Sequence, residues 1–293
     1  MQPKIIVILG PTASGKSDLA VKIAKRFNGE IISADSRQVY RGLNIGSGKI
    51  TKKEMRGIPH YLLGVASPKK FFSVDKYKQL AQKSLNKILS RGKIPIICGG
   101  TGLYIDSLIY NYQFPAVPPD IKLRKKLENL TTAKLLKKLE VLDSEYAKKI
   151  DTRNPRRLMR AIEIATALGK IPELKKEARY DILKIGLRLP DKKIKANIEK
   201  RLYKRLGIGM IAEVKKLHDQ GLSWKKLDNL GLEYRFLSRY LRGLITKEEM
   251  RKLILKESFR YAKRQMTWFK RDKETIWINK PSGVSKRIEK FLT

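Results

Sequence analysis

The N-terminal part of the chain alternates between continuous apolar runs and segments whose apolar residues have helical spacing. Residues 4–10 form a β-branched run that ends in glycine and predicts a buried strand. Residues 18–27 have the pattern of an amphipathic helix, and Asn28 and Gly29 are typical of its end. Residues 30–34 predict a second strand, which ends immediately before Asp35.

The same alternation continues along the chain. Residues 74–91 predict a helix closed by Gly92, and residues 94–100 predict another buried strand. Strands that are apolar along their whole length and alternate with helices are typical of parallel sheets covered on both faces. The predicted fold class is therefore α/β, with a parallel sheet at its centre.

Segment 110–120 contains three prolines and interrupts this pattern, so we place the edge of the core there. The predicted helices beyond it span residues 122–130, 132–142, 156–168, 196–220 and 247–270. Two further strands are indicated at 182–189 and near Thr275. We predict a nucleotide-binding-like core that begins with residues 1–115, a helical insertion over 116–200, and a helical part over 201–293 that packs back on the core.

The charge balance narrows the class of partner. The 293 residues include 66 Lys and Arg against 28 Asp and Glu, a net charge of +38 that is spread along the whole chain. Such an excess repels itself in a compact state, so nucleic acid, phosphates or an anionic membrane surface become the leading partners. The plainer alternative is a lysine-rich composition on a solvated surface.

Cysteine content and apolar run lengths bear on the compartment. Cys98 is the single cysteine, which excludes an internal disulfide and any metal site made only of cysteines. No run approaches the ~18 apolar residues of a membrane span, and Ile5 to Leu9 is too short for a signal-peptide core. We therefore predict a cytoplasmic protein, with a monomer as the default oligomeric state.

A phosphate-binding motif follows the first predicted strand and opens the first predicted helix. This phosphate loop consists of Gly10, Pro11, Thr12, Ala13, Ser14, Gly15, Lys16 and Ser17. Its glycines allow backbone N–H groups to surround phosphate oxygens, Lys16 reaches the terminal phosphates, and the Ser17 hydroxyl can bind Mg²⁺. The motif predicts a di- or triphosphate ligand, and by itself it leaves open whether that ligand is ATP or another pyrophosphate ester.

Further motifs occur in a fixed order around this loop. They are IISADSRQVYRGLNIGSGK at 31–49, IPHYLLG at 58–64, FSVDKYKQLA at 72–81, IPIICGGTGLYIDSL at 94–108, NPRRLMRAIEIATALGK at 154–170 and YAKRQMTWFKR at 261–271. With the phosphate loop, they make the chain resemble the tRNA dimethylallyltransferase family over nearly its whole length.

The resemblance implies a prenyltransferase with a P-loop NTPase-like core, a helical insertion, and the tRNA anticodon arm between them. The implied reaction transfers the dimethylallyl group of dimethylallyl pyrophosphate to the exocyclic N6 of the adenosine 3′-adjacent to the anticodon. The phosphate loop would then hold the pyrophosphate of the isoprenoid, with Mg²⁺ as the cofactor. Pyrophosphate is the leaving group.

The resemblance also implies roles for individual residues. Asp35 is the candidate base, because the adenine amine is a poor nucleophile that needs a carboxylate to orient it and take its proton. The segment Asp35, Ser36, Arg37 and Gln38 corresponds to residues that touch the target base and its neighbours. Thr101 corresponds to the hydroxyl beside the leaving pyrophosphate and the bound tRNA, and Arg201 to an arginine on the pyrophosphate.

The predicted helical insertion corresponds to the tRNA-contacting part. Its candidate RNA-binding residues are Arg124, Arg156, Arg157, Leu158, Met159 and Arg160. A solvated helix face is the usual explanation for arginines at this spacing. The absence of matching acids nearby favours phosphate contacts here. We assign no role to Glu233 or Tyr234, because GLEYRFL at 231–237 departs from the family's pattern.

Plainer structural roles stand beside the functional ones. Asp35 could cap a helix or lie in the second shell of Mg²⁺, and Thr101 could cap the following helix. Cys98, in an apolar strand, is expected to be a buried and inert thiol. Trp268 and Phe269 could form a base-stacking platform, but on a helix we expect them to pack in the core.

Three other functions compete with tRNA prenylation. A transferase that acts on free adenine nucleotides would share the phosphate loop and the base, but it would not need the arginine-rich insertion. An ATP-dependent small-molecule kinase would explain the phosphate loop and leave the DSRQVY segment at 35–40 unexplained. A non-catalytic RNA-binding protein would not explain an intact phosphate loop with Lys16.

Overall fold

The computed structural model describes residues 2–280 and 282–293, and it divides into two compact units. The core unit contains the residues up to Asn111 and those from Ala178 onwards, and the insertion unit spans Tyr112–Glu177. The sequence placed the insertion at 116–200. Residues 178–200 instead belong to the core unit, because the strand at 181–187 pairs with the N-terminal strand of the sheet.

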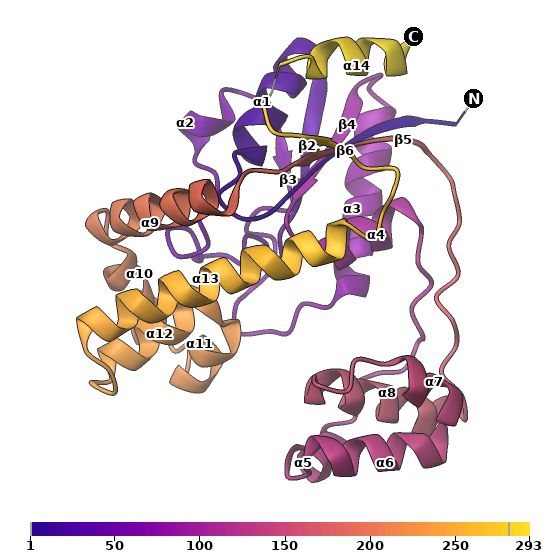
Figure 1. The fold of residues 1–293 in the computed structure, drawn as a ribbon, viewed down its shortest axis with the longest axis vertical. Coiled ribbons are helices and arrows are strands. Elements are labelled where there is room, and N and C mark those ends of the chain that lie inside the picture. The colour runs from indigo at the N-terminus through magenta and orange to yellow at the C-terminus, as the bar shows by residue number, and fades with distance from the viewer. Residues whose placement is uncertain (1, 281) are drawn as a thin grey trace. The chain divides into compact units, whose positions relative to one another are not determined.

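A parallel sheet forms the centre of the core unit (Figure 1), as the apolar runs predicted. Its strands among the described residues are β1 (Lys4–Leu9), β2 (Gly29–Ala34), β3 (His60–Tyr61), β4 (Ile94–Gly99), β5 (Asp181–Leu187) and β6 (Ile276–Ile278), in the order β3-β2-β4-β1-β5-β6. All neighbouring pairs are parallel. β1 therefore lies between β4 and β5, with β2 on the far side of β4.

Helices cover both faces of this sheet. Alternate residues of β1 point to opposite faces, so Ile6 and Ile8 pack with α1 (Lys16–Arg26) and α14 (Val284–Leu292). Val7 points to the other face, where the cluster contains residues of α3 (Val74–Leu89) and α4 (Gly102–Ile109). α2 (Lys52–Met55) lies in the connection between β2 and β3. Strands buried on both faces explain why the apolar runs are continuous.

The remaining helices of the core unit follow β5. They are α9 (Asp191–Gly207), α10 (Met210–Asp219), α11 (Trp224–Leu230), α12 (Leu232–Leu241) and α13 (Lys247–Phe269). The prediction of one helix over 196–220 is wrong, because Gly209 adopts a φ of +98° and separates α9 from α10. α13 begins at a capping box formed by Thr246 and Glu249, and it packs against α4, α9 and α12.

The insertion unit is helical, as predicted. It contains α5 (Ile121–Glu128), α6 (Thr132–Leu142), α7 (Ser144–Lys149) and α8 (Pro155–Leu168). Its own apolar core includes Leu135 and Leu139 of α6 and Leu158 and Ile162 of α8. α8 begins at Pro155, and the Asn154 side chain caps it by accepting bonds from two backbone N–H groups.

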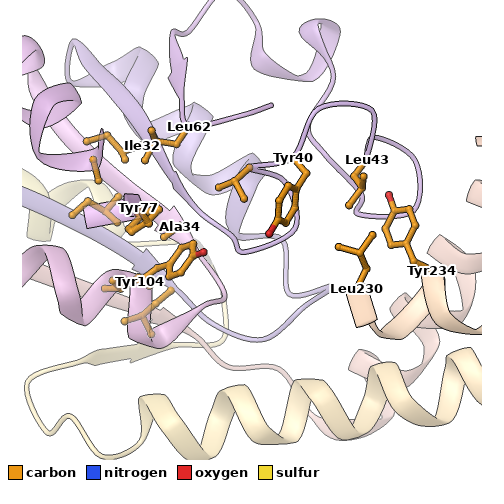
Figure 2. Close-up of a cluster of buried hydrophobic side chains, with 14 of the residues drawn as sticks. Ile32, Ala34, Tyr40, Leu43, Leu62, Tyr77, Tyr104, Leu230 and Tyr234 are labelled. Carbon is orange, nitrogen blue, oxygen red and sulfur yellow. The ribbon is translucent and has the colours of Figure 1, made fainter. Parts of the chain in front are cut away.

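An apolar cluster joins the sheet to the C-terminal helices of the core unit. Figure 2 shows Ala34 of β2 near the ring of Tyr104, and Leu43 near Tyr234 of α12. Tyr77 and Tyr104 stack with their ring centroids 4.0 Å apart. This packing fixes the segment that follows β2 against α11 and α12. Among the described residues, no helix has the length and apolarity required to cross a membrane.

Candidate active site

Three loops that follow adjacent strands meet at the carboxyl edge of the sheet. The phosphate loop follows β1, Asp35 follows β2, and Thr101 follows β4. Because β4 lies between β1 and β2, the parallel topology brings these loops together. The candidate residues of the core unit are thus neighbours in space although they are far apart in sequence.

The phosphate loop has the backbone geometry of an anion cradle. Gly10 has a φ of +147°, and a Cβ atom there would lie 2.8 Å from the Leu187 carbonyl oxygen, so only glycine fits. Gly15 precedes α1 with a φ of +91°, which directs the N-terminus of that helix at the loop. The Ser14 hydroxyl is buried and has no hydrogen-bond partner among the described residues. Ser17 is exposed at the start of α1.

Lys16 lies across the loop and close to Arg201. Its ammonium group donates to the Pro11 carbonyl at 2.9 Å. Burial lowers the pKa of Lys16, and the Arg201 guanidinium lowers it further, while Asp35 raises it. Burial also lowers the pKa of Arg201, as does the neighbouring Arg205. Cations crowded together in a partly buried site favour a bound anion.

Asp35 is half-buried and held in a fixed orientation. Its Oδ1 atom accepts hydrogen bonds from the backbone N–H groups of Arg37 at 2.8 Å and Gln38 at 3.2 Å. The Oδ2 atom accepts no hydrogen bond from any residue in the described part of the chain. The residues that follow Asp35 form a turn and not a helix, so the helix-cap alternative for Asp35 is wrong. Holding this turn and acting on substrate are compatible roles, because they use different oxygens of the same carboxylate.

Thr101 occupies the N-cap position of α4, but its hydroxyl makes no cap hydrogen bond. Its Oγ1 instead accepts from the backbone N–H of Ser36 at 3.1 Å. The helix-capping alternative for this side chain is therefore wrong. The hydroxyl couples the loop after β4 to the loop that contains Asp35.

Tyr261 is a site residue that the motif analysis missed. It lies on α13, half-buried, and its hydroxyl lies within interaction range of the Thr101 side chain. Burial raises the pKa of Tyr261 to about 12, and the nearby Asp35 carboxylate acts in the same direction. The sequence placed this tyrosine in a family motif, but no local signal indicated that α13 returns to the carboxyl edge of the sheet.

Residues 44–48 form a loop that is held from two sides. The Glu213 carboxylate of α10 accepts from the backbone N–H groups of Asn44, Ile45 and Gly46 at 3.0, 2.6 and 2.9 Å. It also accepts from the Tyr234 hydroxyl at 2.9 Å. From the other side, Gln38 donates to the Gly48 carbonyl at 3.2 Å.

Two arginines and a glutamate complete the support of this loop. Arg205 of α9 donates to the Gly46 carbonyl at 2.9 Å and pairs with Glu233 of α12 at 2.9 Å. Arg201 lies directly against the loop, because a Cβ atom on Gly48 would be 2.5 Å from its guanidinium. Glu233 and Tyr234, to which the sequence assigned no role, therefore hold the loop beside Arg201. Arg37 donates to the Leu230 carbonyl at 2.6 Å and so contacts the C-terminal helices.

The arginines of the insertion unit have acidic partners that the sequence analysis did not recognise. Arg124 forms a bidentate pair with Glu163 at 2.6 and 2.7 Å, and Arg160 approaches the same carboxylate at 3.3 Å. The premise that no acids lie nearby is therefore wrong. Glu163 is only three residues from Arg160, but it is buried inside the unit, where it also binds the distant Arg124.

The start of α8 remains the most accessible part of this group. Arg156 and Arg157 are exposed, and Arg157 lies 3.6 Å from Asp151. Met159 is partly buried against the core of the unit. Leu158 is fully buried, so its side chain stabilises the unit and has no surface available to RNA.

Within the described residues, no three His, Cys, Asp or Glu side chains converge as a metal site would require. A phosphate-bound Mg²⁺ does not need such a cluster, because it keeps several waters and takes few protein ligands. The exposed Ser17 hydroxyl at the start of α1 is a suitable oxygen donor for an ion of this kind.

Comparison with known sequences finds relatives that match this chain over nearly its whole length. A family model described as IPP transferase matches residues 38–272, a range that begins after the phosphate loop and Asp35. The tRNA dimethylallyltransferase of Acetivibrio thermocellus is 43% identical over 286 residues, which cover 94% of this chain and 91% of that protein. The tRNA dimethylallyltransferase of Anoxybacillus flavithermus is 41% identical over 300 residues, covering 100% and 96% of the two chains.

Solved structures are similar as well. The tRNA isopentenylpyrophosphate transferase of Bacillus halodurans superposes with a TM-score of 0.76 at 34% identity, covering 100% of this chain and 97% of that one. A eukaryotic dimethylallyltransferase acting on tRNA superposes with a TM-score of 0.81 at 25% identity, covering 97% and 75%. The phosphate loop, Asp35 and Thr101 lie within the region covered by these full-length similarities.

Proposed function

The chain belongs to the IPP transferase family of tRNA dimethylallyltransferases, and we propose that Asp35, Thr101, Arg201 and the phosphate loop perform the prenyl transfer in it. In this reaction the dimethylallyl group of dimethylallyl pyrophosphate moves to the N6 amine of the adenosine 3′-adjacent to the anticodon. Family membership disfavours the kinase and the non-catalytic RNA-binding alternatives.

The observation that supports these roles best is the proximity of a buried cationic pocket to the Asp35 carboxylate. Lys16 and Arg201 approach each other at the phosphate loop, where burial lowers the pKa of both. Asp35 affects the pKa of both cations and so lies in the same site, yet its Oδ2 atom accepts no hydrogen bond from the described residues. A site with these two halves can bind a leaving anion and accept a proton from the nucleophile.

The chemistry follows from this arrangement. The allylic C–O bond of dimethylallyl pyrophosphate breaks, a bond forms between that carbon and N6, and the N6 proton moves to Asp35 Oδ2. The phosphate-loop N–H groups, Lys16 and Arg201 stabilise the negative charge that develops on pyrophosphate. We assign the Thr101 hydroxyl the role of contacting the leaving group and the adjacent nucleotide.

We assign Ser17 as the protein ligand of a Mg²⁺ ion that neutralises the pyrophosphate charge and helps it to leave. Ser17 stands at the N-terminus of α1, next to Lys16, and its side chain is exposed. The remaining ligands would be phosphate oxygens and water.

The proposed tRNA contacts lie in both units. In the core unit, Ser36, Arg37 and Gln38 lie beside Asp35, and the target base would be flipped out of its stack to reach them. In the insertion unit, the exposed Arg156 and Arg157 are the leading phosphate contacts. Arg124 and Arg160 share Glu163, so their guanidinium groups are held in place before any RNA arrives. A tRNA substrate and a single reduced cysteine are consistent with a cytoplasmic enzyme, which we take to act as a monomer.

One assay tests the reaction and its acceptor. The protein is incubated with labelled dimethylallyl pyrophosphate in parallel reactions that contain unmodified tRNA, AMP or ATP. Label that moves only to tRNA supports the proposal. Transfer to AMP would instead indicate the free-nucleotide transferase, and hydrolysis of ATP without label transfer would indicate a kinase-like activity.

A further inference from the structure

The amide of Gln265 joins two of the three loops at the active site. Its Oε1 atom accepts from the backbone N–H of Thr12, in the phosphate loop, at 2.8 Å. Its Nε2 atom donates to the carbonyl of Gly100, which immediately precedes Thr101, at 2.8 Å. Gln265 is 6% exposed. A single side chain on α13 thus links the loop after β1 to the loop after β4.

The requirement for an amide is strict at this position. The side chain must accept a hydrogen bond from the Thr12 N–H and donate one to the Gly100 carbonyl. Glutamine is the long side chain that offers both an acceptor and a donor without a charge. Gly100 leaves the necessary room, since a Cβ atom there would lie 2.2 Å from Nε2. An unsatisfied backbone group at this depth would be costly, so both hydrogen bonds define the distance between the loops.

α13 holds this side chain firmly. Residues at i, i+4 and i+7 lie on one helix face, and Tyr261, Gln265 and Trp268 have this spacing. The Tyr261 hydroxyl lies within interaction range of the Thr101 side chain. The Trp268 indole packs on Gly102 and donates to the Asp106 carboxylate at 2.9 Å. The whole face therefore lies along the first turn of α4, with the amide of Gln265 at its centre.

We propose that Gln265 is a positioning residue that sets the separation of the phosphate loop from Thr101 during prenyl transfer. This inference rests on the roles proposed above for those two groups. Gln265 touches neither substrate. It fixes the position of the phosphate loop relative to the Thr101 hydroxyl, so that both can contact the oxygen atoms of the departing pyrophosphate.

The test is Gln265→Glu, which keeps the shape of the side chain and replaces its donor. At alkaline pH the carboxylate of this variant and the Gly100 carbonyl would both be acceptors and would repel each other, which should displace the loop. We expect kcat to fall about 100-fold, the effect of roughly 1 Å of misplacement. KM for tRNA should change less than threefold, because no RNA contact is altered. Circular dichroism and thermal melting establish that the variant is folded.

A pH series separates positioning from general support of the fold. A protonated glutamic acid offers the same donor and acceptor pair as glutamine, so activity relative to the wild type should rise as the pH is lowered from about 8.5 to 6. The ionisable side chains nearby, Asp35, Lys16 and Tyr261, are present in both enzymes, so the ratio to the wild type at each pH isolates the effect of the substituted group. Gln265→Met has neither group, and its defect should not depend on pH.

Gln220→Glu introduces the same charge change on the exposed end of α10 and should leave kcat unchanged at every pH. A folded Gln265→Glu enzyme with wild-type kcat across the series, or equal pH dependence in the Glu and Met variants, would overturn the inference. Wild-type protein that transfers no label to tRNA would instead reject the proposed function.

Discussion

The Oγ1 atom of Thr101 accepts a hydrogen bond from the backbone N–H of Ser36 at 3.1 Å, and this bond couples two loops of the active site. The hydroxyl proposed to contact the leaving group is thereby attached to the residue that follows the proposed base. A displacement of either loop would change the geometry at both ends of the reaction. The predictions below begin from this coupling.

Thr101→Ala should lower kcat by about 10- to 100-fold, because it removes the acceptor for the Ser36 N–H and the hydroxyl beside pyrophosphate together. Thr101→Ser keeps both functions and should retain most of the activity. Single-turnover transfer of labelled dimethylallyl to tRNA measures the two variants. Equal losses in Ala and Ser would show that the methyl group, and not the hydroxyl, is what matters.

Asp35→Asn should reduce transfer by about 10²- to 10⁴-fold, the usual contribution of a general base. The amide oxygen can still accept from the N–H groups of Arg37 and Gln38, so the turn should persist. Filter binding should give a tRNA affinity within a few-fold of the wild type. A variant with normal turnover and much weaker tRNA binding would assign Asp35 to recognition.

Tyr261→Phe should lower kcat by about tenfold, because it removes the polar group that faces the Thr101 side chain. Burial raises the pKa of Tyr261 to about 12, so this phenol stays protonated at every pH at which the enzyme works. The pH dependence of kcat should therefore keep its shape in the variant. If the rise or fall of kcat with pH seen in the wild type were lost in Tyr261→Phe, the tyrosine would have to titrate during turnover.

Arg157→Ala should weaken tRNA binding and reduce the slope of log K against log salt by about one unit, as expected for one lost phosphate contact. Lys138→Ala removes an exposed cation from α6 of the same unit and serves as the matched control. Binding is measured between low and moderate salt for both variants. If the salt slope fell equally in Arg157→Ala and Lys138→Ala, general electrostatic attraction would explain the effect and Arg157 would have no defined phosphate contact.

Arg124→Ala should destabilise the insertion unit by about 2 kcal/mol, because it leaves Glu163 buried with a poorer set of partners. Arg124 is partly exposed, which reduces the loss below that of a fully buried pair. Thermal melting at neutral pH measures the change. Similar melting of variant and wild type would show that Arg160 alone satisfies Glu163.

The same pair makes a prediction about acid. Burial by itself raises the pKa of Glu163, but hydrogen bonds from Arg124 and Arg160 and the charge of Arg124 lower it overall. A carboxylate whose folded pKa is depressed stabilises the protein at neutral pH, and this stabilisation is lost as the pH falls through the folded pKa. The difference in stability between wild type and Arg124→Ala should therefore shrink in acid.

Much of the core unit could be predicted from local pattern. β1 and β4 are almost continuous apolar runs because the sheet buries both of their faces, and β2 follows the same pattern apart from Glu30 and Ser33. The phosphate loop is equally local, since its glycines, Lys16 and Ser17 lie within eight consecutive residues. The break at Gly209 was missed because a single glycine inside a helical pattern does not reveal its φ.

Local sequence patterns were thus sufficient to predict the fold class and the phosphate loop, and the ordered motifs were sufficient to predict the family. Which distant groups meet in space is evident only once the chain is folded. Gln265 reaches Thr12 and Gly100, Tyr261 reaches Thr101, and Glu163 holds Arg124, although none of these partners is near in sequence. Hydrophobic periodicity states which face of α13 is buried, but it contains no information about which loop that face covers. The order of strands in the sheet and the packing of α13 across its carboxyl edge supply that information, because contacts between distant segments arise only when the whole chain is folded.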